Sequence, residues 1–185
     1  MDKIILGLVG EIASGKGTTA KYLQDKYGGK THRFSTMLRD VAHRMHLEES
    51  RENLQKLSTA FRQYFGDDIL STTIYHDVSE DVGALVVIDG IRRYPDIKHM
   101  STLPEFKLVY IEASAENRYK RIIERGENAD DKNKTFEEFK KDHSYETEKD
   151  IVGLKSKSDF IINNDGNLAD LYPQIDKIIN ELKNK

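Results

Sequence analysis

The stretch that decides the fold is the glycine-rich turn Gly10–Thr18, which reads GEIASGKGT. It follows a continuous apolar run, Ile4–Val9, of the kind found in strands buried on both faces of a parallel sheet. A helical stretch over Thr18–Tyr27 comes next, and Gly28 and Gly29 end it. Glycines in this position let the backbone turn tightly, so that successive N–H groups point into one concavity that holds phosphate oxygens. The sequence therefore predicts a phosphate-binding loop between a strand and a helix.

Within this loop, the pattern G-x-x-x-x-G-K predicts that the backbone N–H groups and one lysine bind the phosphates of a nucleotide. Lys16 is expected to reach the β- and γ-phosphates, and the helix that starts near Gly17 adds the positive end of its dipole. Gly17 itself stands where the common form of the motif has a Ser or Thr that holds magnesium. The residues predicted to contact the nucleotide here are Gly10, Ala13, Ser14, Gly15, Lys16, Gly17, Thr18 and Thr19.

Strand-like and helix-like stretches alternate along the rest of the chain. Further strands are expected at 31–34, 84–88, 106–111 and 159–162, with helical patterns between them and a final amphipathic helix over 167–183. Such alternation predicts an α/β fold in which helices cover both faces of a five-stranded parallel sheet. We expect one domain over residues 1–185, with an acceptor-binding insertion at about 35–80 and a small lid at about 126–147.

Bulk composition narrows the classes of partner. The net charge is −3, from 29 basic and 32 acidic residues, which argues against a nucleic-acid or anionic membrane partner. The absence of cysteine excludes disulfides and zinc–thiolate sites, and the six histidines lack ligand spacing. No stretch is long and apolar enough to span a bilayer. We expect a soluble cytoplasmic protein, either a monomer or a homodimer.

One polar segment interrupts the alternation. Residues 126–134 read GENADDKNK, and Thr135 with Glu138 forms a capping box that opens a helix carrying Phe136 and Phe139. Its place before the last strand predicts a small mobile lid. The alternative is a solvated excursion without a function.

An aspartate and several arginines fall where a phosphoryl-transfer site would need them. Asp89 ends the strand at 84–88, so it is expected at the carboxyl edge of the sheet, where it could order magnesium water or the nucleophile. The alternative is a turn-forming Asp before Gly90. Phosphoryl transfer uses arginines to hold the acceptor phosphate and to neutralise the group in flight. The candidates are Arg39, Arg62, Arg92, Arg93, Arg118, Arg121 and Arg125.

Several segments, taken in order, resemble the broad P-loop kinase group that holds dephospho-coenzyme A kinases, deoxynucleoside monophosphate kinases and adenylate-kinase-like proteins. The segments are the loop 10–18, STMLRD (35–40), ENLQKLSTAFRQYFGDDI (52–69), VVIDGIR (86–92) and SDFIINNDGNL (158–168). The form G-K-G-T is similar to that of adenylate kinases. The resemblance implies a three-layer P-loop kinase fold, with magnesium held through water and carboxylates, and Thr18 and Thr19 on phosphate.

The resemblance also implies roles for single residues. Catalysis would fall to Lys16, Asp89, Arg121 and Arg125, and a water-mediated magnesium contact to Thr18 and Asp89. The acceptor would lie on Arg39, Arg62 and Arg92, while Arg118, Asn164 and Gly166 would lie beside ATP. The predicted lid departs from adenylate kinases because it holds no arginine. The lysines that could substitute are Lys132, Lys134, Lys140 and Lys141.

The function predicted is that of a kinase using ATP and Mg²⁺ to phosphorylate a nucleoside or deoxynucleoside monophosphate. One alternative is a dephospho-coenzyme A kinase-like enzyme. Another is a nucleotide-dependent regulatory ATPase or switch that binds a macromolecular partner, for which acceptor-side arginines and a lid have no use. A nucleic-acid end kinase conflicts with the acidic charge balance.

Overall fold

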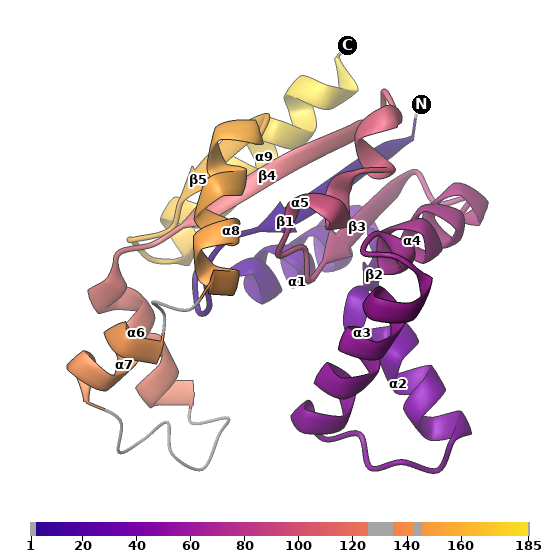
Figure 1. Cartoon of the computed structure of the whole chain (residues 1–185). Helices are drawn as coiled ribbons and strands as arrows, with labels where there is room; N and C mark the ends of the chain where they lie inside the picture. The colour runs from indigo at the N-terminus through magenta and orange to yellow at the C-terminus, as the bar shows by residue number, and fades with distance from the viewer. Residues whose placement is uncertain (1–2, 126–134, 143–145, 185) are drawn as a thin grey trace.

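The computed structural model describes residues 3–125, 135–142 and 146–184, and for residues 142 and 146–149 it describes the backbone alone. Strands and helices alternate as the apolar pattern predicts (Figure 1). The strands are β1 (Ile4–Val9), β2 (Lys30–Arg33), β3 (Leu85–Asp89), β4 (Phe106–Glu112) and β5 (Phe160–Asn163). The helices are α1 (Lys16–Tyr27), α2 (Phe34–Arg44), α3 (Arg51–Phe65), α4 (Ile69–Glu80), α5 (Tyr94–Ile97), η1 (Met100–Thr102), α6 (Ala115–Arg125), α7 (Phe136–Asp142), α8 (Glu146–Leu154), η3 (Lys155–Lys157) and α9 (Leu168–Lys183).

All five strands form one parallel sheet in the order β2-β3-β1-β4-β5. The central strand β1 pairs with β3 on one side, where Ile4 lies opposite Leu85, and with β4 on the other, where Val9 lies opposite Tyr110. The chain thus places β3 and β4 on either side of β1, so that their carboxyl ends flank the loop that follows Val9. This is the switch point at which ligands bind in open parallel sheets.

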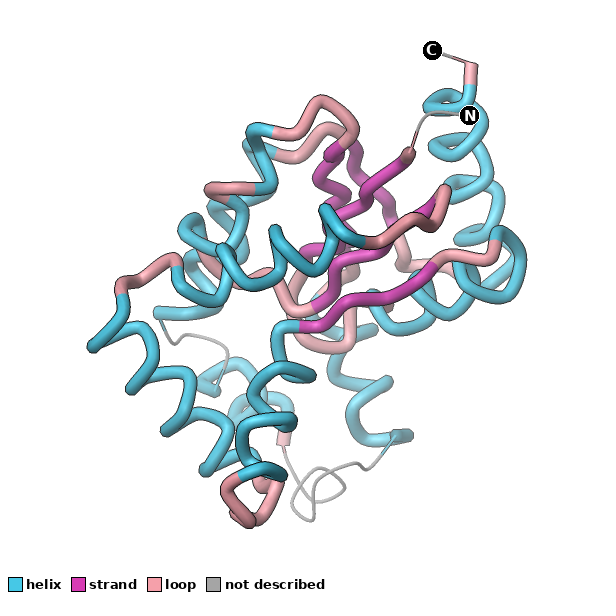
Figure 2. The backbone as a smooth tube through the Cα atoms, turned by 90° about the vertical axis from the view of Figure 1, so that its right-hand side faces the viewer, coloured by secondary structure: helices cyan, strands magenta, loops and turns pink. Residues whose placement is uncertain are grey.

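Alternate residues of the strands enter two separate cores, one on each face of the sheet. On one face, strand side chains such as Leu6 and Leu8 pack against α1 and α9, through Leu23 and Ile175 among others. The other face packs against α2, α4, α5 and α8, with Ile74 of α4 wholly buried. Figure 2 shows the sheet between helices on both sides. The expected three-layer α/β fold is confirmed.

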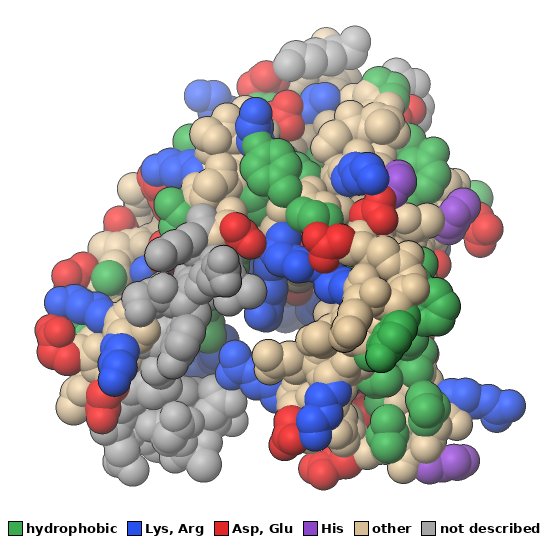
Figure 3. All heavy atoms as spheres, viewed as in Figure 1, with side chains coloured by type: hydrophobic (Ala, Val, Ile, Leu, Met, Phe, Trp, Pro, Cys, Tyr) green, Lys and Arg blue, Asp and Glu red, His purple; other side chains and the backbone are tan. Residues whose placement is uncertain are grey.

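Two helical arms extend beyond the carboxyl end of the sheet. Helices α2 and α3 form one arm, and α6 with α7 forms the other (Figure 1). The space-filling view shows the surface hollowed between the arms, with Lys and Arg side chains at the inner end of the hollow (Figure 3). The phosphate loop and the ends of β3 and β4 therefore lie where the two arms meet the sheet.

Most of the expected elements are present, with shifted ends. Helix α1 begins at Lys16 instead of Thr18, and ends where Gly28 adopts a left-handed φ of 69°. The capping box that opens α7 is confirmed, because the Thr135 N–H donates to the Glu138 carboxylate at 2.8 Å and the Thr135 hydroxyl accepts from the Glu138 N–H. Helix α4 is not among the helices expected from the sequence pattern. Residues 126–134 and 143–145 of the predicted lid lie outside the described residues.

Candidate functional site

The phosphate loop owes its shape to glycines that no other residue could replace. Gly10 and Gly15 have φ values of 152° and 111°, a region that L side chains rarely adopt. A Cβ on Gly10 would lie 2.2 Å from the Ile111 carbonyl oxygen, and one on Gly15 would lie 2.1 Å from Asn164 Nδ2. Ala13, between them, has a φ of 58°. The loop is thus a tightly turned backbone pressed against the ends of β4 and β5.

Lys16 lies across the mouth of this loop. It is the first residue of α1, and its Nζ donates hydrogen bonds to the carbonyl oxygens of Gly10, at 2.7 Å, and Glu11, at 3.0 Å. The ammonium group is therefore fixed at the N-terminal end of a twelve-residue helix, where the helix dipole also favours an anion. Two sources of positive potential converge on one point.

The loop and the first turns of α1 also carry hydroxyl groups with different surroundings. Ser14 Oγ and Thr19 Oγ1 are both buried, and neither has a hydrogen-bond partner within the part of the chain that the structure describes. Thr18 and Gly17 are exposed, and a Cβ on Gly17 would meet nothing within 4 Å. Packing therefore does not require a glycine at position 17.

Arg121 and Asn164 hold the loop in place. Asn164, which is 6% exposed, donates from Nδ2 to the Ser14 carbonyl oxygen at 2.7 Å. The guanidinium of Arg121 donates to the carbonyl oxygens of Ala13, at 3.3 Å, and of Asn164, at 2.6 Å. Both residues thus lie against the phosphate loop. These contacts of Arg121 support the loop backbone, and the predicted roles of Arg121 in catalysis and of Asn164 beside ATP stay predictions.

The loop after β5 is tied to the start of α6. Asp165 accepts hydrogen bonds from the Ser114 N–H, at 2.6 Å, and from Asn117 Nδ2, at 2.9 Å. These bonds lower the pKa of the Asp165 carboxyl from its usual value of 3.8, and the bond from the Ser114 N–H has the largest effect. Gly166 follows, and a Cβ there would lie 2.4 Å from the Asp170 carboxylate. This loop is therefore rigid beside the phosphate loop.

Arg118 forms an ion pair with Glu11, which was not among the residues expected at the site. Its side chain is 6% exposed, and Nη2 pairs with the Glu11 carboxylate at 2.8 Å. Its guanidinium also lies 5.5 Å from the ring of Phe139 in α7, while Nη1 is buried without a hydrogen-bond partner among the described residues. An acidic side chain in a loop that binds anions is tolerable because Arg118 neutralises it. Because no local pattern links residues so far apart, the pairing of Arg118 with Glu11 could not be predicted.

Asp89 lies at the carboxyl end of β3, as expected, with 20% of its side chain exposed. Its Oδ2 is 3.4 Å from Nε of Arg33, the residue that lies opposite it in β2. Arg33 was not among the sequence candidates, although its position at the end of a parallel strand was available as a signal. Within the described ranges, no cluster of three or more His, Asp or Glu side chains could hold a metal ion by itself. The donor set fits magnesium held mainly by nucleotide phosphates and water, with Asp89 the carboxylate at hand.

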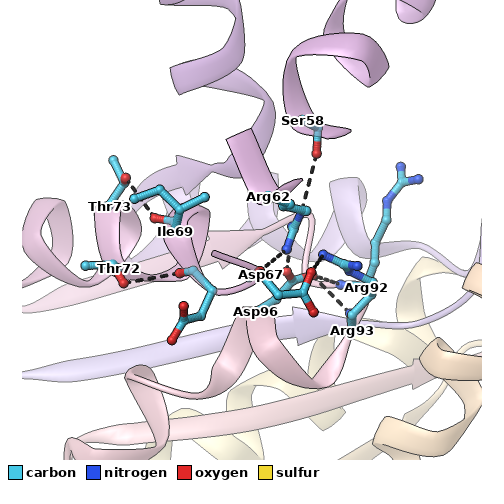
Figure 4. Close-up of polar contacts among 10 residues, drawn as sticks. Ser58, Arg62, Asp67, Ile69, Thr72, Thr73, Arg92, Arg93 and Asp96 are labelled. Carbon is cyan, nitrogen blue, oxygen red and sulfur yellow. Dashed lines mark hydrogen bonds and ion pairs between the residues drawn. The ribbon is translucent and has the colours of Figure 1, made fainter. Parts of the chain in front are cut away.

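The acceptor-side arginines differ in how firmly they are held. Arg62 is 14% exposed and pairs with Asp96 at 2.8 Å (Figure 4). Arg39 is half exposed and lies 3.7 Å from Glu49. The Arg92 side chain is exposed and extends away from Asp96 in the same view (Figure 4). The sequence missed Asp96, because a lone aspartate in YPDI reads as a helix-capping residue.

The remaining candidates belong to the second arm. Arg125 is the exposed last residue of α6. Lys140 pairs with Glu137 at 3.2 Å and lies 4.3 Å from the centre of the Phe136 ring, and Lys141 is exposed. Lys132 and Lys134, the other proposed substitutes for lid arginines, lie outside the described residues.

Comparisons with known proteins match the part of the chain that contains the phosphate loop. A family described as “AAA domain” matches residues 9–140, which include the phosphate loop, Asp89, the first arm and all but the last two residues of α7 in the second. The chain belongs to this family. Similar curated proteins include the UPF0200 proteins of Methanoregula boonei and Pyrococcus furiosus. The first is 27% identical, over 97% of this chain and 97% of the relative, and the second is 26% identical, over 95% and 96%.

Solved structures show the kinase-like character of the fold. Shikimate kinase from Bacteroides thetaiotaomicron aligns with a TM-score of 0.65 at 15% identity, over 97% of this chain and 98% of that one. Dephospho-CoA kinase from Campylobacter jejuni aligns with a TM-score of 0.59 at 17% identity, over 96% of both chains. At these identities the likeness concerns the fold alone. The chain has a P-loop kinase-like fold, and no helix among its described residues is both long and apolar enough to cross a membrane.

Proposed function

We propose that this protein is an ATP- and magnesium-dependent kinase that transfers the γ-phosphoryl group of ATP to a nucleoside or deoxynucleoside monophosphate. The observation that carries the proposal is a phosphate loop next to a second set of basic residues at the carboxyl end of the same sheet. Lys16 is fixed over the loop that follows β1, while Arg39 and Arg62 belong to the arm of α2 and α3 and Arg92 follows β3. The arm borders the hollow that Figure 3 shows. A nucleotide-dependent switch has no need of the second set.

Each group has a defined task in this reaction. The loop amides and Lys16 would hold the β- and γ-phosphates and stabilise negative charge as it develops on the oxygen that bridges them. Magnesium, when bound, would neutralise charge on the same phosphates. An acceptor phosphate oxygen would form a bond to the γ-phosphorus as the bond to the bridging oxygen breaks, and ADP would leave. The arginines would hold the acceptor in line for this attack.

The geometry of the loop supports a phosphate ligand. Lys16 Nζ is held by the carbonyl oxygens of Gly10 and Glu11 at the N-terminal end of α1, where the ammonium group and the helix dipole both favour an anion. The loop bears on nucleotide binding alone, so the acceptor has to be identified by experiment.

A screen of purified protein with ATP and Mg²⁺ tests the proposal. The acceptors are the ribonucleoside and deoxyribonucleoside monophosphates, dephospho-coenzyme A and shikimate, and ADP formation is measured against a reaction without acceptor. We expect one or a few monophosphates to raise ADP formation and to yield the diphosphate. Transfer to dephospho-coenzyme A alone would favour the alternative kinase. ATP hydrolysis that no small acceptor stimulates would favour the regulatory ATPase.

A further inference from the structure

Asp96 of α5 is one of the most buried ionisable side chains in the described structure. Its side chain is 2% exposed, although a carboxylate that leaves water must find compensating partners. It has three. Oδ1 accepts from Nη2 of Arg62 at 2.8 Å, and Oδ2 accepts from the backbone N–H groups of Arg92, at 2.9 Å, and Arg93, at 3.0 Å (Figure 4).

These partners come from two sides of the acceptor region. Arg62 belongs to the arm helix α3, whereas Arg92 and Arg93 form the turn between β3 and α5. Part of the arrangement is local, because the Arg93 N–H at the start of α5 donates to the Asp96 side chain three residues later. A four-residue helix needs neither the second N–H nor a guanidinium from a distant helix. Asp96 therefore does more than cap α5.

Arg62 is held in one position by this network. Besides Asp96, it donates from Nη1 to the Asp67 carbonyl oxygen at 2.6 Å and from Nε to Ser58 Oγ at 3.4 Å. A guanidinium has five N–H donors, so two have no hydrogen-bond partner among the residues that the structure describes. A side chain fixed in this way loses little rotamer freedom when it binds a ligand. The two remaining donors of Arg62 can therefore bind a ligand with little further loss of side-chain entropy.

We propose that Asp96 is a positioning residue of the acceptor site, which aligns the Arg62 guanidinium with the backbone turn that carries Arg92 so that both meet one acceptor phosphate. The inference rests on the proposed kinase function. In this proposal, the buried Asp96 carboxylate holds the acceptor arm, through Arg62, in a fixed position relative to the turn after β3. The nucleotide loop shares none of these contacts.

The first test is Asp96→Asn, measured with the monophosphate identified in the screen. The amide oxygen can still accept from the backbone, but the negative charge opposite Arg62 is lost. We expect the KM for the acceptor to rise by about tenfold or more and the KM for ATP to change by less than about twofold. The matched control is Asp68→Asn, which removes a carboxylate bonded to Lys98 and His99 between α4 and α5 but touches none of the arginines. Both KM values should stay within about twofold in this control.

A double-mutant cycle separates positioning from a purely structural role. If Asp96 acts through Arg62, then adding Asp96→Asn to Arg62→Ala should raise the acceptor KM by less than about twofold further. Independent, additive increases would overturn the inference. Should Asp96→Asn fail to fold, Arg62→Lys takes its place, because lysine keeps the charge opposite Asp96 but lacks the planar fork that reaches Asp67 at the same time. The same selective rise in acceptor KM is expected.

The outcomes for the function and for the inference are distinct. Transfer by the wild type with an unchanged acceptor KM in Asp96→Asn overturns the inference and leaves the kinase function intact. Absence of transfer, together with absence of monophosphate binding by calorimetry, overturns both. Monophosphate binding without transfer overturns the kinase function alone, provided that Asp96→Asn weakens that binding by about tenfold and Asp68→Asn does not.

Discussion

At the scale of single residues, Lys16 is the group on which the proposed reaction most depends. Its ammonium is fixed over the phosphate loop by the carbonyl oxygens of Gly10 and Glu11. Lys16→Ala removes charge that would stabilise the transferring phosphoryl group, so we expect kcat to fall by about a thousandfold or more. Steady-state turnover measures this, and circular dichroism checks that the fold is retained. Lys21→Ala is the control on the same helix, since Lys21 is exposed and, among the described residues, its ion pair is with Asp25 on the surface. Near-normal turnover in Lys16→Ala would remove the loop from the catalytic site.

Gly17 and Gly15 differ in what they tolerate, although both belong to the G-K-G stretch. A Cβ on Gly17 meets nothing within 4 Å, whereas one on Gly15 would collide with Asn164 at a φ of 111°. We therefore expect Gly17→Ser to fold, with stability equal to or up to about 0.5 kcal/mol above the wild type, because serine is the better helix former. Its hydroxyl would stand where related loops hold magnesium, so half-maximal activity should need less Mg²⁺.

Gly15→Ser is the counterpart that should fail. We expect it to lower the thermal midpoint and to abolish ATP binding, because the loop can no longer pack against Asn164. Thermal melts and nucleotide titration of both variants measure the contrast. Equal behaviour of the two serine variants would contradict the loop geometry.

The sequence predicted which residues meet at the site better than it predicted their partners. Lys16 and Asp89 are candidates because the loop pattern and the strand end are local signals, whereas Asn164 is a candidate through the family resemblance. The partners of the arginines, Glu11 and Asp96, depend on how distant segments pack, and a charged residue has no period that reveals its contact. Arg62 thus carries an ion pair that the pattern could not show.

At the scale of elements, α7 follows from its sequence because capping and aromatic spacing are both local. The aromatic rings that fix it to α6 are less obvious. Phe139 is 1% exposed, with its ring centre 5.6 Å from that of Tyr119 and 6.1 Å from that of Phe136. Helix α4 was missed although its buried residues Leu70, Ile74 and Val78 recur every four residues, because most of its other residues are β-branched or polar.

Phe139→Ala should loosen α7 without unfolding the sheet. Removing a buried phenylalanine costs about 3–5 kcal/mol of packing, and here the loss falls on one short helix and on Arg118 beneath it. We expect faster amide hydrogen exchange in α7, unchanged exchange in β1 and β4, and more ATP hydrolysis relative to transfer as water gains access. Phe136→Ala, at a half-buried position, is the graded control and should have a smaller effect. Uniform protection across α7 in Phe139→Ala would mean that the aromatic cluster does not hold the helix.

At the scale of the whole molecule, the five-stranded sheet was predictable because most of its strands are apolar runs in the sequence. The right-handedness of the crossover connections then leaves few possible topologies. Strand β2 is the exception, with four residues of which none is buried. Polar contacts accompany it. His32 and Lys30 of β2 contact the Asp81 carboxylate at 2.8 and 3.3 Å, and Asp81 also accepts from the Gly83 N–H at 2.7 Å. This cluster joins the edge strand to the segment between α4 and β3.

The Asp81 cluster makes the free energy of unfolding depend on pH in the acidic range. The hydrogen bond from His32, ahead of those from Gly83 and Lys30, lowers the pKa of Asp81 from 3.8 to about 2. Because the folded state has the lower pKa, the unfolded chain takes up the proton first as the pH falls. The stabilisation is therefore complete above about pH 4 and is lost as the pH drops toward about 2. Asp68, whose pKa is also lowered to about 2 by Lys98 and His99, contributes in the same window.

Urea denaturation between about pH 5 and pH 2 measures this dependence as the slope of the unfolding free energy against pH. We expect Asp81→Asn to be less stable than the wild type at pH 5 and to lose less stability on acidification, so that the two curves converge near pH 2. Asp25→Asn is the control, because Asp25 forms an exposed pair with Lys21 that contributes little. Its curve should run parallel to that of the wild type. Parallel curves for Asp81→Asn as well would show that the edge strand is held by backbone pairing with β3 and not by this carboxylate.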